Sequence, residues 1–256
     1  MKIQHVILAP KFELATYFIN FWSNEYYYWL RREGYNPVIL DAEKDVKANF
    51  NAAVMSSLDP FVCGGGHANQ FVVTGQKYDI LVDSRSLADL AILKGAFWHT
   101  VSCRFGQAKD TLLRAGVRTF CGAVEDYVFC FANPNNIADP IAHTFWESEN
   151  AYDKILHAEK EKDTPDGDAD ELAYEASQAM YLKRYQGATY GDHKQLLMYD
   201  KIIQTHGPGK AGGPGPVQGK AMARLLIRVG TDTVYNQASE NPQEVSLDVE
   251  PILVPA

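Results

Sequence analysis

The residues best suited to do chemistry in this chain are a histidine and a cysteine. His67 follows a run of glycines at 64–66, and Cys103 follows the apolar segment 97–102. A cysteine becomes a strong nucleophile when a neighbouring base takes its proton, and imidazole is the commonest such base. If the two preceding segments are adjacent parallel strands, both side chains lie at the carboxyl edge of one sheet, where open α/β sheets build their sites. The pattern predicts a cysteine nucleophile with a histidine base.

The position of Cys103 between two elements bears on the reactivity of its thiol. The segment before it has the β-branched and aromatic composition of a strand, and residues 107–115 have a helical pattern. A turn from strand to helix exposes its side chain and points it toward the helix N-terminus, where the dipole favours an anion. We therefore expect an exposed Cys103 with a stabilised thiolate.

Strand and helix patterns alternate along the chain, which is typical of βαβ units in a mostly parallel sheet with helices on both faces. The expected strands are 2–8, 37–40, 61–63, 97–102 and 117–121, with a small hairpin at 72–73 and 79–82 and a further strand at 195–199. The expected helices are 15–33, 49–55, 86–95, 107–115, one that Asp139 caps and Pro140 opens, and 170–185. The sequence predicts an α/β domain over residues 1–205.

Two segments have the composition of loops. Residues 159–168 are charged and follow a strong helix, so we expect an exposed loop there and hypothesise that it is a self-cleavage or activation segment. Residues 206–220 are rich in glycine and proline, which no regular element accommodates. Segments 221–229 and 244–253 are then expected to be late strands, so that 221–256 belongs to the same domain.

The composition excludes several classes of function. The net charge is −8, from 24 Lys and Arg against 32 Asp and Glu, which argues against nucleic-acid binding. Polar residues interrupt the most apolar stretches before these reach the length needed to cross a bilayer, so we expect no membrane insertion. The four cysteines lie in apolar or glycine-rich stretches without a secretory signal before them, so we expect reduced thiols in a cytoplasmic protein. Self-association into a homo-oligomer is compatible with the sequence.

A zinc site is the main alternative use of the same residues, because Cys63 and His67 are spaced like His99 and Cys103. Residues four apart on an extended strand are separated by about 13 Å, so His99 and Cys103 cannot share one ion if their segment is a strand. The glycine-rich loop at 207–220 lacks the spacing of a Walker A phosphate-binding loop. We therefore expect no metal and no cofactor.

The order of these motifs resembles the caspase-like cysteine peptidases of clan CD, nearest to CHAT-type and gingipain-like members. The resemblance rests on a strand, a glycine-rich turn with histidine, a strand that ends in Ser-Cys, and a helix. The segments SLADLAILKG (86–95) and TLLRAGVRTFCGAV (111–124) are similar to elements that flank the cysteine strand in this family, and YGDHKQL (190–196) is similar to a stretch of gingipain-like members. The resemblance spans residues 2–199 and is strongest over 61–124.

The resemblance implies a caspase-like three-layer sandwich and a hydrolase, a thiol protease that acts on protein or peptide substrates through a thioester. It implies that His67 is the general base, that Cys103 is the nucleophile, and that the backbone N–H groups of Ala68 and Cys103 form the oxyanion hole. Two positions depart from the family pattern. Ala68 replaces the usual glycine, and Val101 replaces the acidic residue of arginine-specific members, so nothing indicates cleavage after arginine.

Two other functions remain open. A catalytically inactive caspase-like scaffold or assembly protein would explain Ala68, the long glycine- and proline-rich loop and the extra C-terminal strands. An amidotransferase or DJ-1-like cysteine enzyme also carries its cysteine on a strand-to-helix turn, but its histidine lies downstream, which here would be His143 or His193.

Overall fold

The computed structural model describes residues 3–57, 59–208 and 235–236 of the chain. Its centre is a six-stranded sheet in the order β2-β1-β3-β6-β7-β9. Neighbouring strands are parallel except at one edge, where β9 runs antiparallel to β7. The strands of this sheet are β1 (Gln4–Ala9), β2 (Val38–Asp41), β3 (Pro60–Gly64), β6 (Phe97–Thr100), β7 (Thr119–Ala123) and β9 (Gln204–Gly207). The prediction of an α/β fold with a mostly parallel sheet is confirmed.

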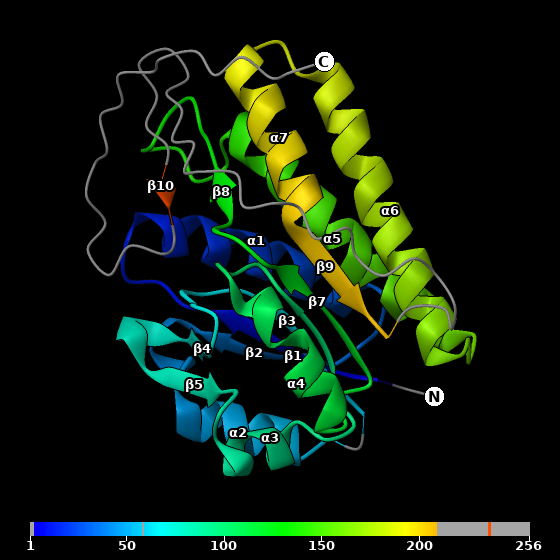
Figure 1. Ribbon diagram of the computed structural model, residues 1–256. Helices are drawn as coiled ribbons and strands as arrows, with labels where there is room; N and C mark the ends of the chain where they lie inside the picture. Colours follow the sequence, from blue (N-terminus) through cyan, green and yellow to red (C-terminus); the bar gives the residue numbers. More distant parts are fainter. Residues whose placement is uncertain (1–2, 58, 209–234, 237–256) are drawn as a thin grey trace.

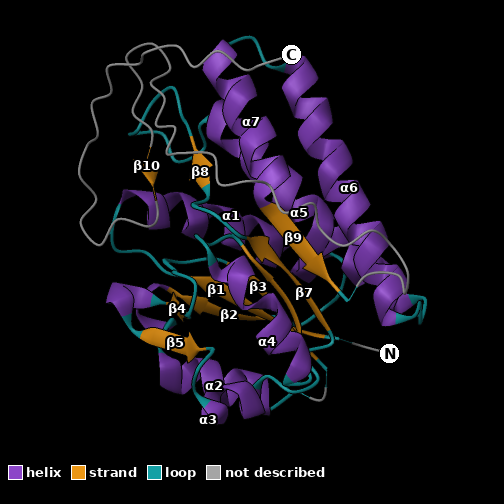
Figure 2. Ribbon diagram, in the orientation of Figure 1, coloured by secondary structure: helices purple, strands orange, loops and turns teal. Residues whose placement is uncertain are grey.

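Helices cover both faces of the sheet, as Figures 1 and 2 show. One face carries α1 (Leu14–Arg32), α5 (Pro140–Glu161), α6 (Asp166–Gly187) and α7 (Gly191–Ile203). The other carries α2 (Lys47–Met55), α3 (Leu87–Ile92) and α4 (Lys109–Arg114). The described helices and the sheet therefore form three layers, with one apolar core on each side of the sheet.

The alternation of side chains along each strand produces these two cores. On β6, Phe97 belongs to the core beneath α1, α5, α6 and α7, whereas Trp98 belongs to the core beneath α2, α3 and α4; both are fully buried. Central parallel strands must be apolar on both faces because helices cover both. This explains why β1, β3 and β6 are buried and carry apolar residues on both faces.

The best-predicted helices carry both a periodic apolar face and a cap. In α1, Phe18, Trp22 and Tyr26 recur at helical spacing and are buried against the sheet. In α5, the Asp139 carboxylate accepts hydrogen bonds from the first-turn N–H groups, and Pro140 occupies the first turn, as expected. Among the described helices, none is both long and apolar enough to cross a membrane.

Short strands lie outside the main sheet. The expected hairpin is present as β4 (Val72–Thr74) and β5 (Ile80–Asp83), which pair antiparallel. Two further strands, β8 (Val128–Phe129) and β10 (Tyr235–Asn236), also pair antiparallel. The described residues also contain the short 3₁₀ segments η1 (Ala42–Lys44), η2 (Gln76–Tyr78) and η3 (Phe105–Ala108).

Three local predictions are wrong. Residues 159–168 do not form a loop, since α5 extends to Glu161 and α6 begins at Asp166. The short connection is held by the buried Lys160 ammonium, which bonds the Asp166 carboxylate at 2.8 Å. Residues 195–199 are helical, within α7, because their apolar positions face the α5–α6 layer rather than a strand partner.

The third error concerns the start of the glycine- and proline-rich segment. His206 and Gly207 belong to β9 and pair with β7, so they are strand rather than loop. The expected late strands at 221–229 and 244–253, and the loop from 209 onward, lie outside the described residues.

Candidate functional site

The two motif-bearing strands are neighbours in the sheet. β3 and β6 pair in parallel, with Phe61 opposite Phe97, and a further bridge joins Gly65 to Val101 beyond the strand ends. The Gly66 N–H then donates to the Ser102 hydroxyl at 3.3 Å, in a fully buried contact. The expectation that the His67 and Cys103 segments leave adjacent strands at the same edge is confirmed.

The glycines before His67 permit this close approach of three strands. A Cβ atom at Gly64 would lie 2.3 Å from the Leu8 carbonyl oxygen of β1, and the φ of Gly64 is +94°. A Cβ atom at Gly65 would lie 2.2 Å from the Val101 carbonyl oxygen. Both contacts are with backbone, so neither can relax by moving a side chain. The glycine run is required by packing around the candidate site.

His67 is held by an acidic side chain that the sequence analysis missed. Its Nε2 atom lies 3.1 Å from Oε1 of Glu13, and the imidazole is only 6% exposed. The rings of Phe12 and Tyr78 pack beside it, with centroids 5.7 and 5.1 Å from the imidazole centroid. This arrangement fixes the orientation of the ring.

Glu13 occupies the N-cap of α1, where the helix itself stabilises its negative charge. Its carboxylate accepts from the Thr16 N–H at 2.8 Å and the Ala15 N–H at 3.2 Å. Burial opposes the charge, but the bonds from His67 and the two amides outweigh it and lower the pKa of Glu13. An ionised carboxylate only accepts hydrogen bonds, so the Nε2–H of His67 is the donor to Glu13.

Glu13 could have been identified from the order of the strands, not from its distance along the sequence from His67. Glu13 follows β1, which is the other neighbour of β3. Carboxyl ends of adjacent parallel strands meet at one edge, but the order of strands cannot be seen in the sequence. The capping pattern of Glu13 and Thr16 alone indicates only a helix start.

Cys103 is not exposed, contrary to expectation. The residue is fully buried, and its thiol donates to the Tyr127 carbonyl oxygen over 3.7 Å. Burial, followed by the negative charge of Asp126, raises the pKa of the Cys103 thiol well above its ordinary value. The side chain joins the core that also contains Phe97 and Val101.

The helix after Cys103 also differs from the prediction. The 3₁₀ segment η3 separates the cysteine from α4, which has only six residues. The intervening Arg104 adopts a left-handed φ of 57°, and its guanidinium bonds the Asp126 carboxylate at 2.6 Å. No helix N-terminus therefore faces the thiol, and the expected stabilisation of a thiolate is absent in this conformation.

The proposed oxyanion donors lie on either side of the β3–β6 junction. Ala68 is 8% exposed and forms an antiparallel bridge with Val73, while the Thr74 N–H donates to the His67 carbonyl at 2.8 Å. The backbone of Ala68 does not have a positive φ. An alanine therefore fits here without backbone strain.

His99 lies in a buried ionic cluster instead of a metal site. Its Nδ1 is 2.7 Å from Asp153, and its Nε2 is 2.8 Å from Glu149, both on α5. Burial opposes a charge, but the attraction of these carboxylates outweighs it and raises the pKa of His99 to about 10. Within the described ranges, no group of three or more His, Cys, Asp or Glu residues could hold a metal ion.

The histidines of the amidotransferase-like alternative have other partners. His143 pairs with Glu25 at 2.9 Å, and His193 bonds the Thr144 hydroxyl at 2.7 Å. Both contacts join helices to one another on one side of the sheet. Neither arrangement supports a role beside Cys103.

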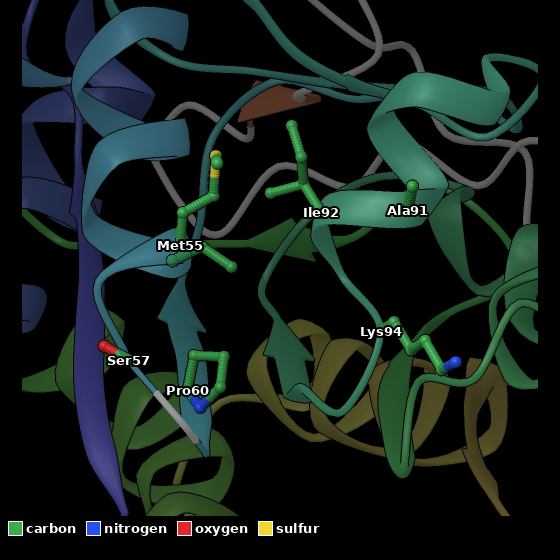
Figure 3. Close-up of a pocket in the computed structure, with 7 residues that line it drawn as sticks. Met55, Ser57, Pro60, Ala91, Ile92 and Lys94 are labelled. Carbon is green, nitrogen blue, oxygen red and sulfur yellow. The ribbon is translucent and has the colours of Figure 1, made fainter.

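A surface pocket lies away from this edge, between α2 and α3 (Figure 3). Its volume is about 400 Å³, and its lining is mostly apolar: Val54, Met55, Ser57, Pro60, Ala91, Ile92 and Lys94. None of the candidate site residues contributes to it.

Comparison with protein-family models gives no match, and no curated protein matches the chain either.

Proposed function

We propose that this chain is a caspase-like cysteine peptidase in which His67 and Cys103 hydrolyse peptide bonds, with Glu13 orienting the histidine. The observation that carries the proposal is the parallel pairing of β3 with β6, which brings the two motif segments together at one sheet edge. The Glu13–His67 pair adds support, because a base that is itself oriented by a third group is the usual arrangement for activating a nucleophile.

In the first half of the proposed reaction, Nδ1 of His67 takes the proton from the Cys103 thiol. The thiolate attacks the carbonyl carbon, a C–S bond forms, and the electron pair of the carbonyl moves to its oxygen. The N–H groups of Ala68 and Cys103 donate to this oxyanion. When the intermediate collapses, the C–N bond breaks and the imidazolium gives its proton to the leaving amine.

In the second half, a water molecule attacks the thioester. His67 takes a proton from this water, the C–S bond breaks, and the sulfur recovers a proton from the imidazolium. Throughout both halves, the Glu13 carboxylate accepts the Nε2–H and stabilises the positive charge that develops on the ring. Glu13 thus keeps Nδ1 as the basic nitrogen.

The described conformation is a resting one under this proposal. The Cys103 thiol is protonated and directed into the core, so the turn at Cys103 and Arg104 has to open before the thiol reaches a substrate. Opening this turn breaks the Arg104–Asp126 pair and the hydrogen bond from the Arg104 N–H to the Glu125 carbonyl.

The test is to combine the purified full chain with an unfolded, alkylated protein substrate and with a labelled peptidyl acyloxymethyl ketone. We expect cleavage and covalent labelling at Cys103, both lost in Cys103→Ala and in His67→Ala. Cys63→Ala is the matched control, because Cys63 is also fully buried and lies on the adjacent strand. A folded chain that neither cleaves nor takes up the label contradicts the proposal.

The second candidate is an inactive caspase-like scaffold, which the complete burial of Cys103 favours. A scaffold needs no accessible thiol, and a buried thiol with a raised pKa is a poor nucleophile. The same labelling experiment distinguishes the two functions, since a scaffold leaves Cys103 unmodified in the folded chain.

A further inference from the structure

Two buried histidines meet near the amino end of β1, at the opposite end of the strands from His67. His5 lies on β1, where its ring packs on Phe61 of β3 with centroids 5.3 Å apart. His157 lies on α5, and its ring centroid is 5.0 Å from that of His5. The two histidines are only 1% and 4% exposed. Neither takes part in the proposed reaction, so the pair is separate from the candidate site.

Aromatic side chains of α1 and of the turn after it enclose both imidazoles. The His5 ring packs edge to face on Tyr26 of α1, with centroids 5.8 Å apart. The His157 ring lies nearly perpendicular to the rings of Trp29 and Tyr35, at 5.7 and 4.5 Å. The histidine pair therefore joins α1, α5 and β1 through contacts that suit a neutral imidazole.

The ring nitrogens of the pair leave no provision for a positive charge. Nε2 of His5 and Nδ1 of His157 are buried, and neither has a hydrogen-bond partner among the described residues. A neutral imidazole has one N–H and one lone pair, whereas the charged form has two N–H groups that both need acceptors. A buried charge without acceptors is costly. Burial accordingly lowers the pKa of both histidines, and the neighbouring His157 lowers the pKa of His5 further.

The carboxylates that act on the pair lie beside His157. Glu161 is four residues after His157 on α5, and Glu33 follows the end of α1; both attract a proton to His157. Both glutamates are exposed. The charge that acts on His5 is that of His157 itself, which repels a second proton. The first proton taken up in acid therefore goes to His157, and its carboxylate partners lie at the surface.

Other ionisable groups around the pair have partners of their own. The Lys154 ammonium lies over the Trp29 ring at 5.3 Å. The Asp153 carboxylate bonds His99 at 2.7 Å, and the Tyr26 hydroxyl donates to the Asp153 carbonyl at 3.3 Å. The protonation of the pair is therefore governed by its burial and by the two exposed glutamates.

A cavity of about 210 Å³ lies beside the pair, between the start of β1 and the turn from α1 to β2. Its lining includes His5 and Tyr35 together with the exposed residues Gly34 and Asn36. Because exposed residues line the same cavity as His5, water can approach the imidazoles without unfolding of the chain.

We propose that His5 and His157 form an acid-sensitive latch that holds the C-terminal ends of α1 and α5 on β1, and that proton uptake by His157 releases them below about pH 6.5. In the closed state, both rings are neutral and buried. In the open state, the His157 imidazolium lies at the surface with Glu33 and with Glu161, its i,i+4 partner on α5. The latch does not depend on the peptidase function.

Folding should weaken in acid, because the unfolded chain binds protons that the closed latch excludes. The folded pKa of each histidine is the lower one, so this stability is fully present above about pH 6.5 and is lost as the pH falls. A histidine that stays neutral in the folded chain lowers the folding equilibrium constant about tenfold per pH unit. Between about pH 6.5 and about pH 5, we expect His157 to account for a loss of about 10- to 30-fold.

The experiment is urea denaturation of the full chain and its variants at these two pH values. His157→Phe should remove the 10- to 30-fold part of the acid loss, because phenylalanine keeps a ring in place and does not titrate. His157→Gln repeats the comparison with a second neutral side chain if the first variant does not fold. Each variant is compared with itself at two pH values, so a uniform loss of stability does not affect the result. The buried His193, whose pKa is also lowered, contributes equally in all variants.

His143→Gln is the matched control, since His143 is a partly exposed histidine on the same helix. Its pair with Glu25 raises its pKa, so the variant should keep the whole acid loss or increase it. Hydrogen exchange measured by mass spectrometry locates the opening. After correction for intrinsic rates, peptides from the C-terminal ends of α1 and α5 should exchange faster at the lower pH, whereas those of α2 should not.

Two results overturn the latch. One is an acid loss that His157→Phe or His157→Gln retains in full. The other is hydrogen exchange at the ends of α1 and α5 that does not respond to acid, or that responds equally in the His157 variants. Peptidase activity is not measured in either experiment, so the proposed function is tested separately.

Discussion

Replacing His99 with glutamine should strongly destabilise the folded chain. The imidazolium is fully buried between two carboxylates at 2.7 and 2.8 Å. In His99→Gln the neutral amide can donate to one carboxylate, but the positive charge is lost. Breaking a buried ion pair by removing one partner costs about 3–5 kcal/mol, because the remaining charge is left uncompensated.

The pKa of His99 gives a second measure of the same interaction. A value of about 10 in the folded state, against an ordinary value of 6.5, corresponds to about 5 kcal/mol of preferential proton binding. Because the folded pKa is the higher one, this stability is fully present below pH 6.5. It decreases as the pH rises from there and is lost as the pH passes about 10.

Equilibrium denaturation by urea at neutral and at alkaline pH measures both effects. The free energy of unfolding of His99→Gln should lie about 3–5 kcal/mol below that of the unmodified chain near neutral pH. The difference should shrink toward pH 10. His143→Gln is the control, since its partly exposed pair with Glu25 should contribute less than about 1 kcal/mol. A His99→Gln loss below about 1 kcal/mol, or one independent of pH, refutes the reasoning.

Three further outcomes follow from the geometry of the site. Glu13→Gln should lower kcat/KM for peptide cleavage by about 10- to 100-fold, because the neutral amide no longer stabilises the imidazolium of His67. The melting temperature should change little, since the amide oxygen still caps α1. Equal activity would remove Glu13 from the mechanism. Because burial raises the pKa of the Cys103 thiol, iodoacetamide should modify it slowly in the folded chain and fast in urea. Peptide mass mapping measures both rates. Fast modification in the folded chain would contradict the burial of Cys103. Gly65→Ala should destabilise the fold by about 3 kcal/mol or more in urea denaturation, because the added Cβ would lie 2.2 Å from a backbone oxygen. Gly187 has open space around it, so Gly187→Ala should be neutral or slightly stabilising. Similar effects at both positions would refute the packing argument.

Elements with two independent local signals were predicted correctly. The start of α5 combines an aspartate cap with a first-turn proline, and α1 combines a long periodic face with buried aromatic residues. Residues 195–199 carried only a short apolar run, which fits a strand or a buried helix equally well. The charged segment 159–168 was mistaken for a loop because the burial of Lys160 against Asp166 is a tertiary contact that local composition does not show.

By itself, the sequence determined the five parallel strands of the main sheet, the helices α1 and α5, and that His67 and Cys103 each follow a strand, because these properties depend on local composition and periodicity. Only the tertiary structure decided the strand order, which places Glu13 on His67 because β1 and β3 are neighbours. It also decided the direction of the Cys103 side chain, which packs into the core beneath α1, α5, α6 and α7, because the path of the turn after β6 depends on tertiary contacts.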